Sequence, residues 1–407
     1  MQEILLYVSI FIALYFQVFL LLTIYEEDMD TPMAPDPVIW PTVTIAVPCF
    51  NEEKTVGKTL ESLMALEYPK DKLRILVIDD GSTDGTIHAA HRYASPGFIE
   101  ILTKTNGGKH TAVNHALAMT SSEYFGCLDA DSYVEPMTLK YIIRTFLTDD
   151  ETMAVTPTMC VHEPKGFVQQ AQRFEYLLGV FVKQIMSILG AIHVAPGPFS
   201  IFKTEVFSKI GNFKPAHKTE DMEIAFRMQS KRMKIVNSRY AKVHTTTPNT
   251  IKKLFVQRTR WTYGFLRNAY DYRFLFFKKH YGNIGIITLP FAFLSIATTL
   301  YVIIITVQSL FFVAWQYIER LFLFGFHVPR IDGIDNFYIN LQAATIIAMG
   351  VFLFNFVLLC LGQKMGEGRI KLSLDIIWYY LLFTLIAPWW LGKAVYRAVR
   401  LREVTWR

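Results

Sequence analysis

The chain of 407 residues has few charged side chains and few cysteines. Asp, Glu, Lys and Arg make up only 19% of it, whereas 52% of the residues are hydrophobic. This composition excludes a disordered or fibrous chain and is too apolar for an ordinary soluble enzyme. The four cysteines are far apart and show no Cys-x-x-Cys spacing, which argues against a disulfide framework or a zinc site.

The sequence also lacks the motifs of several function classes. It contains no nucleic-acid-binding motif and no serine or thiol nucleophile elbow. The net charge of +6 is modest and suits a membrane face better than a duplex-reading surface. We therefore expect a lipid bilayer as a partner, and no nucleic acid.

What the chain does have is long apolar runs near both ends. Residues 4–24 carry no charge, and a helix over them would reach roughly 31 Å, enough to cross a bilayer. A cleaved signal peptide is less favoured, because no Lys or Arg precedes the run and no small-x-small cleavage site follows it. Three further candidate spans lie near the other end, at 286–316 (or extending to Phe326), 339–362 and 373–391.

These runs predict the domain organisation and the orientation. We expect a transmembrane helix over 1–25, a cytosolic domain over 26–248, an interfacial helical region over 249–283 and a C-terminal transmembrane region over 284–407. The basic loop from Lys364 to Lys371 should be cytoplasmic by the positive-inside rule, which makes this a multi-pass plasma-membrane protein with its large domain inside the cell. The basic tail after Lys393 also favours the inside, yet three C-terminal spans would leave it outside. Either 286–326 is a two-pass hairpin, or Pro388 marks a re-entrant segment.

Between residues 43 and 158 short β-branched runs alternate with helical stretches. This alternation predicts an α/β domain whose mostly parallel sheet carries helices on both faces. Ligands of such sheets bind beyond the carboxyl ends of the strands. The predicted strands are Val43–Val47, Leu73–Ile78 and Tyr124–Leu128, and the predicted helices are Thr55–Ala65, Thr86–Tyr93 and Thr111–Met119.

A polar motif follows each predicted strand. The third strand is followed by Asp129-Ala130-Asp131, whose two carboxylates can point into one crevice. Hard oxygen ligands of this kind suit Mg²⁺ or Mn²⁺, especially an ion shared with a substrate diphosphate. The segment from Asn106 to Lys109 has two glycines and a lysine at a helix start, which fits either a phosphate site or a flexible turn with a solvated lysine. The first two strands are followed by Pro48, Asn51 and Glu52 and by Asp79 and Asp80.

Two more motifs lie further along the chain. Thr219-Glu220-Asp221 begins a predicted helix, and we expect Thr219 to cap that helix and leave Asp221 free. On a helix, Gln257, Arg260, Trp261 and Gly264 share one face, where arginine suits a phosphate and the indole a sugar ring. The alternative is an amphipathic helix that lies on the membrane with a buried tryptophan. A second amphipathic helix, about 167–189, is expected to rest on the bilayer or to pack on the spans.

Together these motifs resemble the inverting family 2 glycosyltransferases with a GT-A type fold. The likeness extends from about residue 48 to 261 and is strongest to the membrane synthases of poly-N-acetylglucosamine, chitin oligosaccharides and hyaluronan. It implies that Asp80 contacts uracil, Asp129 the nucleotide sugar and Asp131 the divalent metal, and that Asp221 is the catalytic base. The resemblance further implies a substrate-binding role for Pro48, Asn51, Glu52, Lys109, Gly197, Pro198, Glu220, Gln257, Arg258, Arg260 and Trp261. Gly197 and Pro198 stand in a turn that departs from the usual family spelling.

The resemblance implies a processive membrane enzyme that uses UDP-N-acetylglucosamine and Mg²⁺ or Mn²⁺ to elongate, and export, a growing β-linked polysaccharide. Inverting transfer needs one base and charge stabilisation of the departing UDP, which a carboxylate and a metal ion can supply. The alternatives are a hyaluronan- or glucan-type synthase with other UDP-sugars, or a transferase that adds one sugar to a polyprenyl phosphate lipid. For a synthase, we expect a polymer conduit lined by Gln308, Trp315, Gln316, Asn355, Trp378, Tyr379 and Tyr380. Trp389 and Trp390 also fit, but an ordinary aromatic belt at the membrane interface explains them better.

Overall fold

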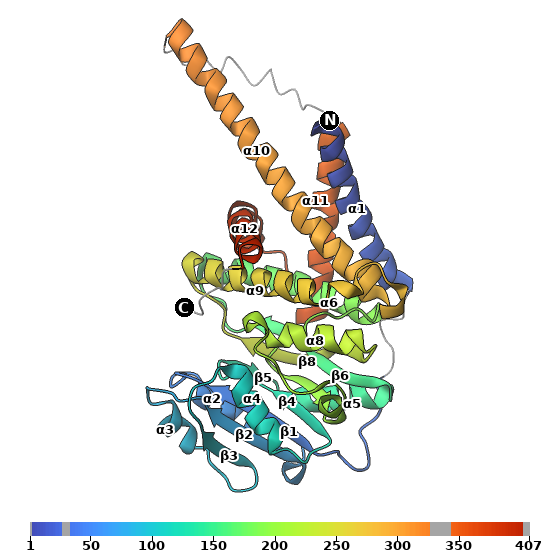
Figure 1. The fold of residues 1–407 in the computed structure, drawn as a ribbon, viewed down its shortest axis with the longest axis vertical. Helices are drawn as coiled ribbons and strands as arrows, with labels where there is room; N and C mark the ends of the chain where they lie inside the picture. Colours follow the sequence, from blue (N-terminus) through green and yellow to red (C-terminus); the bar gives the residue numbers. More distant parts are fainter. Residues whose placement is uncertain (1, 27–32, 326–342, 402–407) are drawn as a thin grey trace.

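The computed structural model describes residues 2–26, 33–325 and 343–401. Figure 1 shows a sheet domain at one end, three long helices at the other, and helices α6 (Gly166–Ile188) and α9 (Ile251–Asp271) lying between them. The three long helices are α1 (Gln2–Glu26), α10 (Leu289–Phe324) and α11 (Ala343–Glu367). Any ligand site at the sheet edge beneath α6 and α9 therefore lies close to the apolar helices.

The sheet has eight strands in the order β3-β2-β1-β4-β7-β6-β8-β5. The first four are parallel, and β6 and β8 are also parallel, whereas β7 and β5 run antiparallel to their neighbours. The predicted α/β class is confirmed, with a mixed sheet. The strands are β1 (Val43–Cys49), β2 (Leu73–Asp79), β3 (Ile99–Thr103), β4 (Tyr124–Cys127), β5 (Ser132–Val134), β6 (Thr152–Val161), β7 (Ser200–Lys203) and β8 (Lys234–Thr245).

Helices cover both faces of this sheet, as expected for strands that are apolar throughout. Successive residues of β1 enter two different core clusters: Ile45 and Val47 pack on one face, and Ala46 packs on the other. The first face is covered by α2 (Val56–Met64), α3 (Thr86–His91) and α5 (Thr138–Thr148), and the second by α4 (Lys109–Ala118), α7 (Glu205–Ile210) and α8 (Glu220–Ser230). The four cysteines are free thiols, as the sequence predicts.

Among the described residues, three helices are long and apolar enough to cross a membrane: Tyr7–Tyr25, Ile284–Leu323 and Ile346–Glu367. Residues 289–324 form one continuous helix, preceded by a π-helical turn at Ile284–Thr288, so the two-pass hairpin is wrong. The predicted span at 373–391 also differs from the structure. Helix α12 (Ile376–Val399) contains Pro388 without a break and lies beside α9, where Leu382 packs with Leu254 and with Val168 of α6.

Helix α6 joins the sheet domain to the membrane helices. Arg173 of α6 makes a two-pronged ion pair with Glu367 of α11, at 2.7 and 2.6 Å. Gly362 of α11 lies so close to α6 that a Cβ atom there would fall within 3.0 Å of the Leu177 carbonyl oxygen. Lys393 of α12 lies over the Phe255 ring of α9, 5.0 Å from its centroid. The end of α11 therefore packs on α6, and α12 packs on α9.

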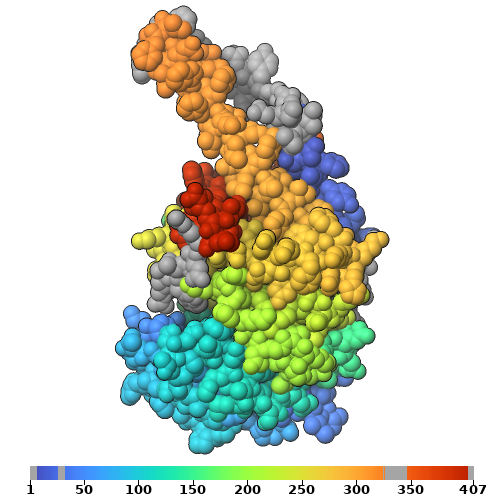
Figure 2. Space-filling view, viewed as in Figure 1, coloured from blue at the N-terminus to red at the C-terminus, as the bar shows by residue number. Residues whose placement is uncertain are grey.

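The residues predicted to line a conduit do not come together in the described part of the chain. Gln308, Trp315 and Gln316 are exposed on the outer half of α10, which stands apart from the other helices in Figures 1 and 2. Asn355 instead accepts a hydrogen bond from the Tyr380 hydroxyl at 3.1 Å, which links α11 to α12. Asn355 thus has a structural partner.

Candidate functional site

The turn after β2 is hydrogen-bonded to the loop that precedes α4. The Asp80 carboxylate is buried and accepts hydrogen bonds from the backbone N–H groups of Gly107 (3.0 Å) and Gly108 (2.8 Å) and from Lys104 Nζ (2.6 Å). The Asp79 carboxylate accepts from the Ser82 N–H within its own turn. The two adjacent carboxylates therefore have different structural roles. Asp79 stabilises its own turn, and Asp80 holds the Gly107–Gly108 loop at the edge of the sheet.

The turn after β1 is tied to the same edge. Pro48 pairs with Ile78 of β2, and Asn51 has a left-handed φ of 58°, which asparagine tolerates better than most residues. The Asn51 side-chain oxygen accepts from Thr83 N at 2.9 Å, and the Glu52 N–H donates to Thr86 Oγ1 at 2.7 Å. The turns after β1 and β2 are thus joined by hydrogen bonds at one edge of the sheet.

Lys109 connects the acidic motif after β4 with the motif at the start of α8. Its Nζ lies 2.5 Å from Asp129 Oδ1 and 3.5 Å from Glu220 Oε1. The two carboxylates keep the pKa of Lys109 above its ordinary value despite burial. Lys109 is therefore an ion-paired bridge rather than a solvated lysine on a flexible turn.

Asp131 lies in a strongly acidic environment. Burial raises the pKa of its carboxyl to about 6, and the neighbouring Asp129 and Glu52 raise it further. No group of three His, Cys, Asp or Glu side chains that could hold a metal occurs among the residues that the structure describes. Asp131 fits a Mg²⁺ or Mn²⁺ ion that takes its other ligands from a diphosphate and water, and its acidic surroundings favour a cation.

Asp221 stands in the first turn of α8, close to this cluster. Burial raises the pKa of its carboxyl to about 6, as does Glu220, whereas Lys109 and Arg260 act in the opposite direction. The Asp221 carbonyl oxygen accepts a hydrogen bond from Ala195 N at 3.1 Å. The base candidate is thereby attached to the turn that contains Gly197.

Thr219 does not cap α8, contrary to the prediction. Its side chain makes no capping hydrogen bond, since it donates to the Ala216 carbonyl (3.0 Å) and accepts from Asn268 Nδ2 of α9 (2.9 Å). A Cβ on Gly264 of α9 would fall within 3.0 Å of the Thr219 side chain. The missing side chain of Gly264 thus leaves the space in which Thr219 packs against α9.

The turn at Gly197 lies against the lysine bridge. A Cβ at Gly197 would fall within 3.0 Å of Lys109 Nζ and 3.2 Å from Asp129 Oδ2. Only a glycine lets the backbone approach this ion pair so closely. The structure thus brings Gly197, and Pro198 beside it, to the acidic cluster.

The Gln257–Trp261 segment runs along α9, above α6. Arg258 forms an ion pair with Glu175 of α6, at 2.5 Å, and its guanidinium stacks on the Trp261 ring, 4.2 Å from the centroid. Arg260 contributes to the electrostatic environment of Asp221. Gln257 Oε1 and Arg258 Nε are buried and have no hydrogen-bond partner among the described residues. Buried polar atoms without a partner are unusual, and a bound ligand, ion or water would satisfy them.

Comparison with known proteins gives matches among the glycosyltransferases and polysaccharide synthases. Residues 44–211 match the model of glycosyl transferase family 2. The chain contains a family 2 glycosyltransferase domain. Poly-beta-1,6-N-acetyl-D-glucosamine synthases of Staphylococcus aureus (strain COL) and Staphylococcus epidermidis are 29% and 30% identical to it over 225 residues, 54% of this chain. That match spans about half of the relatives' own length, 54%.

A solved structure matches almost the whole chain. A mannosyltransferase of Pyrobaculum calidifontis, solved in complex with GDP-Man and Mn²⁺, superposes with a TM-score of 0.65 at 20% identity and covers 99% of both chains. At this identity the likeness shows the fold, which is that of a GT-A glycosyltransferase. The glycosyltransferase domain and the membrane helices therefore both have a counterpart of known structure.

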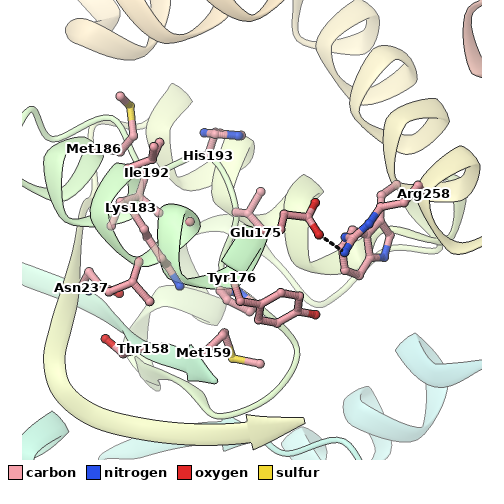
Figure 3. Close-up of a pocket in the computed structure, with 16 residues that line it drawn as sticks. Thr158, Met159, Glu175, Tyr176, Lys183, Met186, Ile192, His193, Asn237 and Arg258 are labelled. Carbon is pink, nitrogen blue, oxygen red and sulfur yellow. Dashed lines mark hydrogen bonds and ion pairs between the residues drawn. The ribbon is translucent and has the colours of Figure 1, made fainter. Parts of the chain in front are cut away.

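A cavity of about 330 Å³ lies between the family 2 domain and α9. Figure 3 shows Glu175, Tyr176 and Lys183 of α6 on its wall, together with His193 and Arg258. Sequence reasoning missed these α6 residues, because their helix was expected to rest on the bilayer or to pack on the spans rather than to bind a ligand. The signal available was the presence of Glu175 and Lys183 on a helix with an otherwise apolar face.

Proposed function

We propose that this chain is an inverting, divalent-metal-dependent membrane glycosyltransferase that elongates a β-linked polysaccharide from UDP-N-acetylglucosamine. The observation that carries the proposal is the Lys109 bridge, which joins Asp129 to Glu220 beside Asp221. The residues assigned to the donor and the residue assigned to base catalysis thus belong to one connected cluster. The likeness to poly-beta-1,6-N-acetyl-D-glucosamine synthases supports the choice of sugar.

In this proposal Asp221 takes the proton of the acceptor hydroxyl. The hydroxyl oxygen bonds to the anomeric carbon of the sugar while the bond from that carbon to UDP breaks, and the electron pair leaves with the diphosphate. A divalent ion on Asp131 would neutralise the charge that develops on the diphosphate. A base with a pKa near 6 is ionised at neutral pH and remains strong enough to take a proton.

The remaining predicted residues frame the substrates. Asp80 fixes the glycine loop from which Lys109 begins α4, and Asn51 and Glu52 close the opposite side of the crevice. Arg260 adds positive charge close to Asp221, and Trp261 forms part of the cavity wall that would face the acceptor. We assign these residues to the uridine, diphosphate and acceptor sides of the same site.

We further propose three spans, with the N terminus outside and the sheet domain in the cytoplasm. Because α10 and α11 form one return pass and α12 lies beside α9, the basic residues of α12 stay on the cytoplasmic side. This arrangement removes the conflict between the basic tail and the basic loop after α11. An Arg397→Cys variant in intact cells should resist a membrane-impermeant thiol reagent and react once the membrane is opened. Reaction in intact cells would refute the topology.

A second candidate function is transfer of a single sugar to a lipid-linked acceptor. The observation that favours it is the outer half of α10, which stands apart from α11 and α12 in Figures 1 and 2. Such an acceptor would reach the site along the membrane and need no conduit.

One experiment separates these functions. Purified protein is incubated with radiolabelled UDP-N-acetylglucosamine, UDP-glucose, UDP-glucuronate or GDP-mannose, and the product is extracted and digested with linkage-specific hydrolases. A water-soluble polymer made from UDP-N-acetylglucosamine supports the proposal. A labelled monosaccharide confined to the lipid fraction would support the second candidate, and incorporation from GDP-mannose alone would refute the assigned donor.

A further inference from the structure

The segment that joins α9 to the apolar helix α10 carries positive charge without negative charge. This connector spans residues 272–283 and contains no Asp or Glu but three basic side chains, Arg273, Lys278 and Lys279. All three are exposed, and none of them makes an ion pair with a carboxylate in the part of the chain that the structure describes. The carboxylate just before the connector, Asp271, is bound to His217 Nε2 at 2.8 Å. The surface of the connector is therefore positively charged.

The remaining side chains of the connector divide between an inner and an outer surface. Leu275 is buried, and the Phe276 ring meets Phe293 of α10 edge-on, with centroids 5.3 Å apart. Phe274 and Phe277 are instead 43% and 77% exposed. Basic and aromatic side chains thus share the outer surface, which is the combination typical of a membrane–water interface.

Phe277 has an unusual backbone conformation as well as an exposed ring. Its φ is 57°, in the left-handed region that bulky residues rarely adopt. At an exposed position in water, this conformation favours glycine or asparagine. A large apolar side chain at such a position has no explanation in contacts within the protein. An apolar environment outside the protein would account for it.

The connector is fixed against the first turn of the apolar helix. The Phe277 N–H donates to the Gly285 carbonyl oxygen at 2.9 Å, and a Cβ at Gly285 would fall within 3.0 Å of the Leu275 carbonyl oxygen. Gly285 belongs to the π-helical turn with which the candidate span Ile284–Leu323 begins. The outer surface of the connector therefore lies where that helix would enter the hydrocarbon of a bilayer.

Helix α1 indicates the same level. The rings of Phe16 in α1 and Phe291 in α10 stack with centroids 4.8 Å apart, and the two helices run in opposite directions (Figure 1). From this contact α1 continues for about 15 Å to its end at Glu26, and the apolar helix reaches back for about 11 Å to Ile284, at 1.5 Å per residue. The connector thus lies close to the level at which α1 ends.

We propose that the connector between α9 and α10 is a docking surface for anionic phospholipids. Arg273, Lys278 and Lys279 bind the headgroup phosphates, and Phe277 inserts at the edge of the hydrocarbon. Each Lys or Arg beside an anionic lipid surface raises the affinity about fivefold. The bilayer is the occupant because the connector continues directly into a span, which holds its outer surface in the headgroup layer. The inference does not depend on the donor, the acceptor or the catalytic residues.

The test is native mass spectrometry of the full chain in detergent, titrated with dioleoyl phosphatidylglycerol or dioleoyl phosphatidylcholine. We expect the anionic lipid to bind at least about tenfold more tightly than the zwitterionic lipid. Lys278→Gln/Lys279→Gln should lower the affinity for phosphatidylglycerol by roughly 25-fold, about fivefold for each lysine, and leave that for phosphatidylcholine unchanged. Lys278→Arg/Lys279→Arg keeps the charge and should keep the preference.

The matched control is Lys58→Gln/Arg92→Gln, which removes the same charge from exposed positions in α2 and just after α3. These helices lie at the end of the sheet domain away from the long helices (Figure 1), so the control should keep the wild-type preference. The melting temperature of each variant is measured to confirm that it is folded.

Phe277→Asn tests the aromatic side chain separately, because asparagine tolerates the left-handed backbone. It should lower the affinity for both lipids by about tenfold without lowering the melting temperature. Equal affinity of the wild-type chain for the two lipids would overturn the proposal. So would a preference retained by Lys278→Gln/Lys279→Gln, or an equal loss of preference in Lys58→Gln/Arg92→Gln.

Discussion

Replacing Gly264 by alanine tests how the two downstream motifs are held together. The new Cβ would fall within 3.0 Å of the Thr219 side chain, which is closer than real Cβ contacts allow. Thr219 cannot turn away at low cost, because its hydroxyl is bound to the Ala216 carbonyl at 3.0 Å and to Asn268 at 2.9 Å. Helix α9 and the start of α8 must therefore move apart.

The size of the effect follows from packing and from the position of Asp221. Overpacking of this kind lowers the free energy of unfolding by about 1–3 kcal/mol. For a domain of this size, each kcal/mol lowers the melting temperature by about 2–4 °C. Asp221 is two residues beyond Thr219, and a displacement of about 1 Å at a reacting group costs on the order of 10²-fold in rate. We expect kcat to fall by roughly 10- to 10²-fold with little change in UDP affinity.

The assay is steady-state UDP release, combined with calorimetric UDP binding and thermal unfolding. Gly392→Ala in α12 is the matched control, because nothing lies within 4 Å of a Cβ at that helical position. The double variant Gly264→Ala/Thr219→Ala removes most of the clash and should recover part of the lost stability. If Gly264→Ala has the same kcat and melting temperature as Gly392→Ala, the close contact between Gly264 and Thr219 does not exist.

Three further outcomes follow from the site. Burial raises the pKa of Asp221 to about 6, and Asp221 must be ionised to act as the base. We therefore expect kcat/KM to reach its maximum above pH 6 and to fall tenfold for each pH unit below it. A kcat/KM that stays constant from pH 8 to pH 5 in folded protein would contradict this. Asp131→Asn should abolish the stimulation of UDP release by Mg²⁺ or Mn²⁺ while the melting temperature is kept, and full wild-type activity in chelator would refute the metal role. Asn355→Leu leaves the Tyr380 hydroxyl without its partner, which costs about 1 kcal/mol, and should lower the melting temperature without changing product length. Shorter product from Asn355→Leu would restore the conduit hypothesis.

The sheet domain could be predicted from the sequence because its signals are local. The first two strands begin at Val43 and Leu73 as expected, since apolar β-branched runs end there in polar turns. The acidic motifs follow from the same reasoning, because parallel strands bring their carboxyl ends to one edge. The placement of Gly197 beside Lys109, and the link between Thr219 and α9, arise from contacts between distant segments that no local pattern contains.

The errors have physical causes of the same kind. Residues 373–391 look like a span because they are apolar, but α12 packs one side on α6 and α9, where Leu382 meets Leu254 and Val168. Thr219 is a residue type that often caps helices, but here its hydroxyl accepts a hydrogen bond from Asn268 of α9 instead. The helix over 167–189 was expected to rest on the bilayer or to pack on the spans, whereas its residue Lys183 lines a cavity.

The most direct test of the central claim is the kinetic comparison of Asp221→Asn with the wild-type chain. The asparagine side chain has almost the same shape but cannot take a proton. The account predicts that kcat for UDP release falls by roughly 10²-fold or more, while calorimetric UDP affinity stays the same. Unchanged turnover, or a collapse of UDP affinity, would show that Asp221 is not the base.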